Sequence, residues 1–224
     1  SLAMNITKFY PKTAKKIVMG VDEVGRGALA GPVYACSVIL LDENLGKIDH
    51  TFIENLKDSK LLSERKRKAI FGKCLEQKVL FGMGRANEFE IETLNILVAS
   101  MLAMVRSARA CIKKLPCYSD RLQVLFDGIY TPNGIPGPWA WNLSSTAIKG
   151  GDKFIPEISC ASVIAKVERD KFMSQLSKKY PAFDFEKNKG YGTNFHVNAL
   201  KNNGISPVHR KTFNPAKKLI CLSR

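Results

Sequence analysis

The stretch "KIVMGVDEVGRGALAGPVYACSVILL", residues 16–41, contains two apolar segments joined by a glycine-rich turn. The first segment, "KIVMGVD", and the last, "PVYACSVILL", are rich in β-branched residues, which is typical of buried strands. The "EVGRGALAG" between them predicts a tight connection, because glycine adopts backbone conformations that other residues avoid. We therefore expect two strands of one sheet, the first of which ends in acidic residues.

Strand and helix patterns alternate along the middle of the chain. Residues 62–78, "LSERKRKAIFGKCLEQK", predict a helix with Ser63 as its N-cap, and "VLFGMGRA" (79–86) predicts a third strand. Residues 88–112 predict one long helix, because apolar residues recur at helical spacing and mark a buried stripe. The stripe consists of Ile91, Leu94, Leu97, Met101, Met104, Ala108 and Ile112.

Two further segments end in an acid. "LQVLFDG" (122–128) predicts a buried strand that ends at Asp127, and "STAIKGGD" (145–152) predicts a short strand that runs into a turn at Asp152. A loop rich in proline and glycine separates them, and residues 157–179 predict another helix. Together these segments predict a mixed α/β sheet covered by helices.

The chain length fits a single large domain. We expect residues 4–224 to form it, with 181–224 as a C-terminal extension of helices and loops, packed onto the sheet, that includes a short helix near 194–202. Ser1, Leu2 and Ala3 precede Met4 and are expected to be a cloning remnant.

Charge is the first indication of a partner. The chain has 35 Lys and Arg against 20 Asp and Glu, a net charge of +15. Such an excess favours a polyanion such as nucleic acid, although a solvated basic surface without a partner is the alternative. No apolar run long enough for a membrane span and no secretory signal is seen, so we expect a cytoplasmic monomer.

Cysteine and histidine do not form a zinc pattern. No Cys-x-x-Cys pair occurs, and the three histidines do not complete a metal spacing. We expect the six cysteines to be free thiols, most of them packed as small hydrophobic residues.

The acids at strand ends predict a metal site. Asp22 and Glu23 follow an apolar strand, and Asp127 and Asp152 each end another segment. Carboxylates that converge at one sheet edge repel one another unless some are protonated or divalent cations neutralise them. Oxygen ligands without nearby His or Cys favour Mg²⁺ or Mn²⁺. Taken singly, each acid has an alternative role as a cap or a surface ion-pair partner.

Three other features suit nucleic acid. The "GRG" turn (Gly25, Arg26, Gly27) would let backbone N–H groups approach a ligand, or it is a plain tight turn. Lys60 is placed to bind a phosphate or simply faces solvent. Tyr191 lies between two glycines in a lysine-rich loop, which suits stacking on a sugar or base as well as a structural role.

Taken together, these segments resemble the ribonuclease HII family, the type 2 ribonucleases H. The matching stretches occur in the family's order: "GVDEVGRGALAGPV", "DSKLLSERKR", "LFDG", "IPEISCASVIAKVERD" and "KGYGTNFHVNALKNNGISPVHRKTF". They extend over residues 20–213. The resemblance implies a ribonuclease H-like mixed β-sheet flanked by helices, with a small C-terminal helical extension.

The resemblance also implies an activity and roles for residues. The activity is metal-dependent endonucleolytic cleavage of the RNA strand of RNA–DNA hybrids, and cleavage 5′ of ribonucleotides embedded in duplex DNA, leaving 3′-hydroxyl and 5′-phosphate ends. It would serve ribonucleotide excision in DNA replication and repair. Two metal ions, Mg²⁺ or Mn²⁺, are implied at Asp22, Glu23, Asp127 and Asp152.

Nucleic-acid contacts are likewise implied. The "GRG" turn would read the 2′-hydroxyl at the RNA–DNA junction, and Tyr191 would stack on the deoxyribose beyond it. Lys60 and Lys166 match basic positions that face nucleic acid.

Three departures from the family pattern stand out. Ala28 occupies a position where the family usually has proline, which we expect to loosen the turn, and Cys160 replaces an alanine. The stretch from Asp127 to Asp152 is longer than usual and leaves Asp170 as a rival to Asp152, although Asp170 is better placed as an ion-pair partner of Lys166.

Two other functions remain open. A non-catalytic duplex-binding protein would explain the basic charge but not the four acids. Another metal nuclease of the same fold, such as a resolvase, would leave the "GRG" turn and Tyr191 without a role. A requirement for Mg²⁺ separates an enzyme from a pure binding protein.

Overall fold

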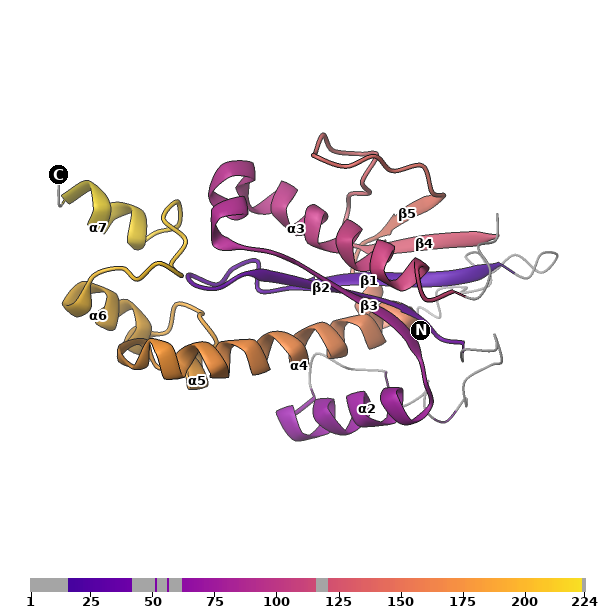
Figure 1. Cartoon of the computed structure of the whole chain (residues 1–224), viewed down its shortest axis with the longest axis horizontal. Coiled ribbons are helices and arrows are strands. Elements are labelled where there is room, and N and C mark those ends of the chain that lie inside the picture. The colour runs from indigo at the N-terminus through magenta and orange to yellow at the C-terminus, as the bar shows by residue number, and fades with distance from the viewer. Residues whose placement is uncertain (1–15, 42–50, 52–55, 57–61, 116–120, 223–224) are drawn as a thin grey trace, which may run out of the picture.

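The structure, a computed structural model, describes residues 16–41, 51, 56, 62–115 and 121–222. Its centre is a five-stranded sheet in the order β3-β2-β1-β4-β5 (Figure 1). The strands are β1 (Ile17–Val24), β2 (Val33–Ile39), β3 (Leu80–Ala86), β4 (Leu122–Asp127) and β5 (Ser145–Ile148). β2 is antiparallel to β1 and β3, whereas β4 is parallel to β1 and β5. The predicted mixed sheet is confirmed.

Helices cover both faces of the sheet. α3 (Glu88–Ile112) lies on one face, while α4 (Pro156–Lys179) lies on the other and packs against α2 (Glu64–Glu76) (Figure 1). The predicted N-cap is confirmed, because the Ser63 side chain accepts a hydrogen bond from Lys66 N. Alternate residues of β1 enter the two cores: Met19 and Val21 face α3, and Val18 faces α4.

α3 is interrupted, although the sequence predicts one continuous helix. Asn95 has φ 68° and ψ 166°, and its side chain accepts hydrogen bonds from Leu97 N and Val98 N. Asparagine tolerates positive φ and caps helices well, so a second helical segment starts here. Leu94 and Leu97 of the predicted stripe are consequently only half-buried.

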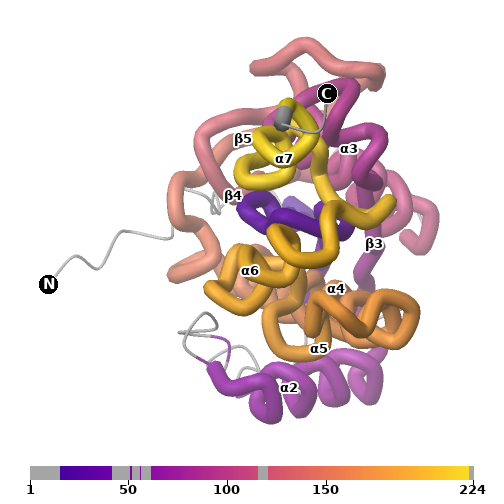
Figure 2. The backbone as a smooth tube through the Cα atoms, turned by 90° about the vertical axis from the view of Figure 1, so that its left-hand side faces the viewer, coloured from indigo at the N-terminus to yellow at the C-terminus, as the bar shows by residue number. Residues whose placement is uncertain are grey.

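The C-terminal extension lies at one end of the sheet rather than on a face. It contains η4 (Pro181–Phe183), α5 (Phe185–Asn188), α6 (Asn194–Asn203) and α7 (Ala216–Leu222), which group around the β1–β2 connection and the last turns of α4 (Figure 2). Leu29 and Ala30 of that connection share an apolar cluster with Phe183, Phe185 and Leu200. The turn "GRG" is therefore built into the junction between sheet and extension.

Most of the cysteines lie in the hydrophobic core. Cys36, Cys74, Cys111 and Cys160 are buried free thiols, as predicted, while Cys221 is exposed and Cys117 lies outside the described residues. Among the described helices, only α3 is long and apolar enough to cross a membrane. Over half of that apolar stretch, 56%, is buried within the protein, so its apolar residues build the core.

Candidate active site

Three of the four predicted acids meet at one edge of the sheet. Val21 of β1 pairs with Phe126 of the parallel strand β4, so Asp22 and Asp127 are the next residues along both strands. Asp22, Glu23 and Asp127 line one cavity of about 240 Å³. Parallel neighbours bring residues distant in sequence to the same edge, which is why an acid at each strand end produces a cluster.

Glu23 reaches this edge from the opposite face of the strand. β1 continues to Val24, so Asp22 and Glu23 alternate between the α4 face and the α3 face. Glu23 lines the first cavity and also a second one of about 230 Å³, which Asp127, Ile129 and Tyr130 line as well. The acidic edge is thus open on both faces of the sheet.

Asp152 joins the cluster through the backbone. It lies in the 3₁₀ helix η3 (Gly151–Lys153) after β5, and its N–H donates a hydrogen bond to Asp127 Oδ1 at 3.3 Å. The Asp152 carbonyl accepts a hydrogen bond of 2.5 Å from Ser159 Oγ of α4. Asp152 is only 1% exposed and does not line the first cavity. The structure places it behind Asp127 rather than beside Asp22.

Burial makes the charged forms of two edge carboxylates, Asp22 and Glu23, costly. Burial, followed by the charges of Glu23 and Asp127, raises the pKa of Asp22 well above its usual value, although a hydrogen bond from Ser162 opposes the shift. Burial also raises the pKa of Glu23; Arg26 lowers it and Asp127 raises it further. A cation at this edge would remove the cost of holding these charges together.

The donor set fits a hard divalent cation. All the ligands on offer are carboxylate oxygens, which Mg²⁺ and Mn²⁺ prefer. Within the described ranges, however, no three His, Cys, Asp or Glu side chains converge closely enough to form a coordination shell. The side chains must therefore draw together around an ion that binds here.

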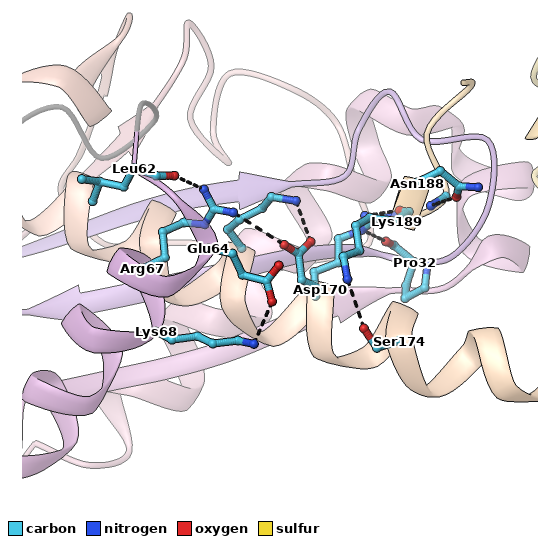
Figure 3. A network of polar contacts seen from close by, with 12 residues as sticks. Pro32, Leu62, Glu64, Arg67, Lys68, Asp170, Ser174, Asn188 and Lys189 are labelled. Carbon is cyan, nitrogen blue, oxygen red and sulfur yellow. Dashed lines mark hydrogen bonds and ion pairs between the residues drawn. The ribbon is translucent and has the colours of Figure 1, made fainter. Parts of the chain in front are cut away.

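Part of the first cavity's wall is basic, and sequence reasoning had not singled out two of the residues that line it. Arg67 of α2 and Ser162 of α4 line it together with Lys166. Asp170 pairs with two basic side chains. Lys166 Nζ lies 2.6 Å from its carboxylate. Arg67 also points towards it (Figure 3), with a nitrogen 3.9 Å from the carboxylate. Asp170 is thus an ion-pair partner, as expected. The signal for Arg67 was the basic run "ERKRK" next to the cap of α2.

The "GRG" turn presents two exposed residues over a buried one. Gly25 has φ 91° and is buried, whereas Arg26 and Gly27 are exposed. Arg26 also lies 3.6 Å from Glu23, so the turn adjoins the acidic edge. Ala28 does not loosen the turn as expected, because its N–H donates a 3.4 Å hydrogen bond to Gly25 O that proline could not make.

Tyr191 lies in the extension, near Lys166. Its ring centroid is 5.8 Å from Lys166 Nζ and 5.4 Å from Arg169 Cζ, and its side chain is half-buried. Lys166 therefore connects the Tyr191 loop with the carboxylate cavity. Lys60, the other predicted phosphate ligand, lies outside the described residues.

A chain of two histidines holds the Tyr191 backbone. Ser206 N–H donates to His209 Nδ1 at 2.9 Å, so the proton of His209 must be on Nε2. His209 Nε2 is 3.0 Å from His196 Nε2, and His196 Nδ1 is 2.9 Å from Tyr191 O. The Ser206 amide thus sets both tautomers, and His196 donates to Tyr191.

Comparison with known proteins shows sequence similarity to ribonucleases HII over most of the chain. The family model described as Ribonuclease HII matches residues 19–216. Ribonuclease HII of Alteromonas mediterranea is 43% identical over 205 residues, covering 92% of this chain and 97% of that protein. Ribonuclease HII of Vibrio campbellii is 43% identical over 211 residues, covering 94% and 90%.

Solved structures share the fold. The crystal structure of ribonuclease H2 from Pyrococcus horikoshii OT3 superposes with a TM-score of 0.66 at 24% identity, covering 90% of this chain and 96% of that one. Bst-RNase HIII in complex with Mn²⁺ gives a TM-score of 0.70 at 15% identity, covering 95% and 72%. At such identities the likeness confirms the ribonuclease H-like fold that the sequence implied.

Proposed function

Because the chain belongs to the ribonuclease HII family, we propose that it is an endoribonuclease that uses divalent metal ions to cut the RNA strand of RNA–DNA hybrids and to cut 5′ of single ribonucleotides in duplex DNA. The ribonuclease H activity comes with the family. The metal requirement, the preference for embedded ribonucleotides and the 3′-hydroxyl and 5′-phosphate ends are our proposal.

One observation carries the proposal: an acidic sheet edge and basic helix residues line one cavity. Asp22, Glu23 and Asp127 line it from β1 and β4, and Arg67 and Lys166 line it from α2 and α4. A phosphodiester needs cations around its oxygens and a place where metal can approach the scissile phosphate. The basic residues supply the cations, and the acids supply the place for metal. A protein that merely binds a duplex does not need the acids.

The acidic residues would bind the metal ions. Asp22, Glu23 and Asp127 would hold the divalent cations, with Asp152 behind Asp127; bound there, these cations supply activation of water and stabilisation of the leaving 3′ oxygen. Burial raises the pKa of both Asp22 and Glu23, so their charged forms are costly until a cation binds.

The basic wall and the turn orient the substrate. Lys166 and Arg67 are held by Asp170 at the cavity and would bind the phosphate backbone. The exposed backbone of Arg26 and Gly27 would contact the ribose 2′-hydroxyl, and the Tyr191 ring would stack on the next deoxyribose. We propose that the protein acts as a monomer and removes ribonucleotides misplaced in DNA.

The test is cleavage of a DNA duplex that contains one ribonucleotide, mapped to the nucleotide, with and without Mg²⁺ or Mn²⁺. We expect one cut, 5′ of the ribonucleotide, that requires metal and leaves a 3′-hydroxyl. Binding without cleavage at any metal concentration would favour the duplex-binding alternative. Cleavage of an otherwise identical all-DNA duplex would favour another nuclease of the same fold.

A further inference from the structure

Two fully buried arginines lie beneath the β1–β2 connection. Arg169 of α4 is 0% exposed and Arg210, between α6 and α7, is 1% exposed. Each guanidinium donates three hydrogen bonds, and all six acceptors are backbone carbonyl oxygens. Arginine alone among side chains supplies a planar fork of donors that satisfies several carbonyls at once.

Arg210 binds the "GRG" turn itself. Its nitrogens donate to Gly25 O at 2.7 Å, Arg26 O at 2.7 Å and Gly31 O at 2.9 Å. In a trans peptide the N–H points opposite to the carbonyl of the same unit. Holding the carbonyls of Gly25 and Arg26 inward therefore turns the N–H groups of Arg26 and Gly27 outward.

These two N–H groups are available for a ligand. Arg26 and Gly27 are exposed, and neither N–H donates a hydrogen bond within the described part of the chain. A Cβ placed on Gly27 would have no protein atom within 4 Å, so the space in front of the turn is open. Two outward amides beside an open space form a small anion or hydroxyl site.

Arg169 supports the same turn from α4. It donates to Pro32 O at 3.0 Å, Ala30 O at 3.1 Å and Lys189 O at 2.8 Å, and so links the turn to the Tyr191 loop. A Cβ on Gly25 would lie 2.2 Å from Arg169 Nε, so the first glycine is needed to let this side chain pass. The absence of a side chain at Gly25 and the position of Arg169 therefore depend on each other.

Two like charges side by side are costly to bury. Burial, followed by the charge of Arg169, lowers the pKa of Arg210 to about 9. Apolar side chains would fill the space without this cost, but they would remove six hydrogen bonds to backbone carbonyls. The cost of burying two neighbouring guanidinium charges is consistent with a role for Arg169 and Arg210 in fixing the positions of those carbonyls.

We propose that Arg210, supported by Arg169, is a positioning residue that fixes the outward amides of Arg26 and Gly27 and thereby sets the enzyme's preference for a ribonucleotide over a deoxyribonucleotide. The inference rests on the proposed function, because it assumes that the "GRG" turn meets the ribose. Arg210 does not touch substrate in this scheme; it acts through the peptide groups that it holds.

The test compares binding of two duplexes of one sequence, one with a single ribonucleotide and one all DNA, without divalent metal. The protein variants are wild type, Arg210→Lys and the control Arg106→Lys. Arg106 also donates to a carbonyl, Arg85 O at 2.8 Å, but on α3 and away from the turn.

Arg210→Lys keeps the charge and loses the planar set of donors, so the preference for the ribonucleotide should fall by about tenfold, as for a lost charged hydrogen bond. Affinity for the all-DNA duplex should change far less, and Arg106→Lys should keep the wild-type preference.

Each outcome decides between the claims. If wild type shows no preference, ribonucleotide recognition in the proposed function is wrong. If wild type prefers the ribonucleotide and folded Arg210→Lys retains that preference, the positioning role is wrong while the function stands.

Backbone amide NMR of the wild-type protein decides the matter independently of folding of the variant. The Arg26 and Gly27 amides should shift and become protected from hydrogen exchange with the ribonucleotide duplex, and less so with the all-DNA duplex. Unchanged amides in the ribonucleotide complex would overturn the inference.

Discussion

The backbone N–H of Asp152 donates a hydrogen bond to Asp127 Oδ1 across 3.3 Å, although 25 residues separate the two in sequence. The chain leaves the sheet edge after Asp127, and the parallel strand β5 (Ser145–Ile148) returns it to the same edge just before Asp152. The length of residues 128–144 does not displace Asp152 from Asp127, because the pairing of β5 with β4 places Ile148 opposite Asp127. The contact between Asp152 and Asp127 is the structural basis for preferring Asp152 to Asp170 in the metal site.

Asp152→Asn should lower cleavage by about 10²–10³-fold, the usual cost of removing one preorganised electrostatic group from a catalytic site. The fold should persist, because the backbone N–H that binds Asp127 remains. Asp184→Asn is a matched control, since the Asp184 carboxylate pairs with exposed Lys187 in the C-terminal extension, and its cleavage rate should be normal. Measured turnover that is lost in Asp170→Asn and retained in Asp152→Asn would transfer the role to Asp170.

Metal binding should be visible without catalysis. Mg²⁺ at tenfold over its dissociation constant stabilises a protein that binds it only when folded by about 1.4 kcal/mol. For a chain of this size the melting temperature should rise by about 3–6 °C. Asp22→Asn should melt higher than wild type in EDTA, because a buried charge with two acidic neighbours is gone, and should lose the response to Mg²⁺. An equal Mg²⁺ response in both proteins would place the metal elsewhere.

The Tyr191 ring should matter more than its hydroxyl. A stacking contact contributes about 1–3 kcal/mol, roughly a factor of 5 to 150 in rate if it is felt only in the transition state. Tyr191→Ala should lose that factor on a single embedded ribonucleotide and less on a uniform hybrid, which lacks an RNA-to-DNA step. Tyr191→Phe keeps the ring and should lose little. Equal losses for both variants, or on both substrates, would show that Tyr191 is structural.

The histidine chain predicts loss of stability in mild acid. Burial, followed by the neighbouring His196, lowers the pKa of His209 to about 4 in the folded protein, against about 6.5 when unfolded. Because the unfolded chain takes up the proton first, stability is complete above pH 6.5 and falls as the pH drops from 6.5 towards 4.

The measurement is urea unfolding at pH 7.5 and pH 5. Wild type should lose roughly 2 kcal/mol of unfolding free energy, since one pKa unit corresponds to about 1.4 kcal/mol. His209→Gln cannot be protonated, so it should be less stable at pH 7.5 but lose less between the two conditions. The same pH dependence in both proteins would assign the effect to other groups.

Binding to nucleic acid should depend steeply on salt. A net charge of +15 gives a docking surface that releases counterions, with a log–log slope of about −0.9 for each phosphate neutralised on B-form DNA. Titration of a labelled duplex between low and physiological salt measures this slope. A flat dependence would mean that the basic residues do not contact the phosphates.

The sequence by itself determined the sheet, the two long helices, the acids at strand ends and the family. Hydrophobic periodicity and glycine turns are local properties, so β1, β2, β3 and α4 match their predicted positions closely. The interruption of α3 was missed because Asn95 interrupts a pattern whose apolar spacing continues.

Only the tertiary structure decided how these pieces work together. No local pattern shows that Arg210, almost at the end of the chain, holds the carbonyls of Gly25 and Arg26, or that Arg169 requires the first glycine of the turn. Buried arginines look like surface charges in a sequence, since burial depends on contacts between distant segments. Likewise, the pairing of β1 with β4 places Asp22 near Asp127, and a backbone hydrogen bond joins Asp152 to Asp127. The residue types were local information, whereas their convergence came from long-range packing.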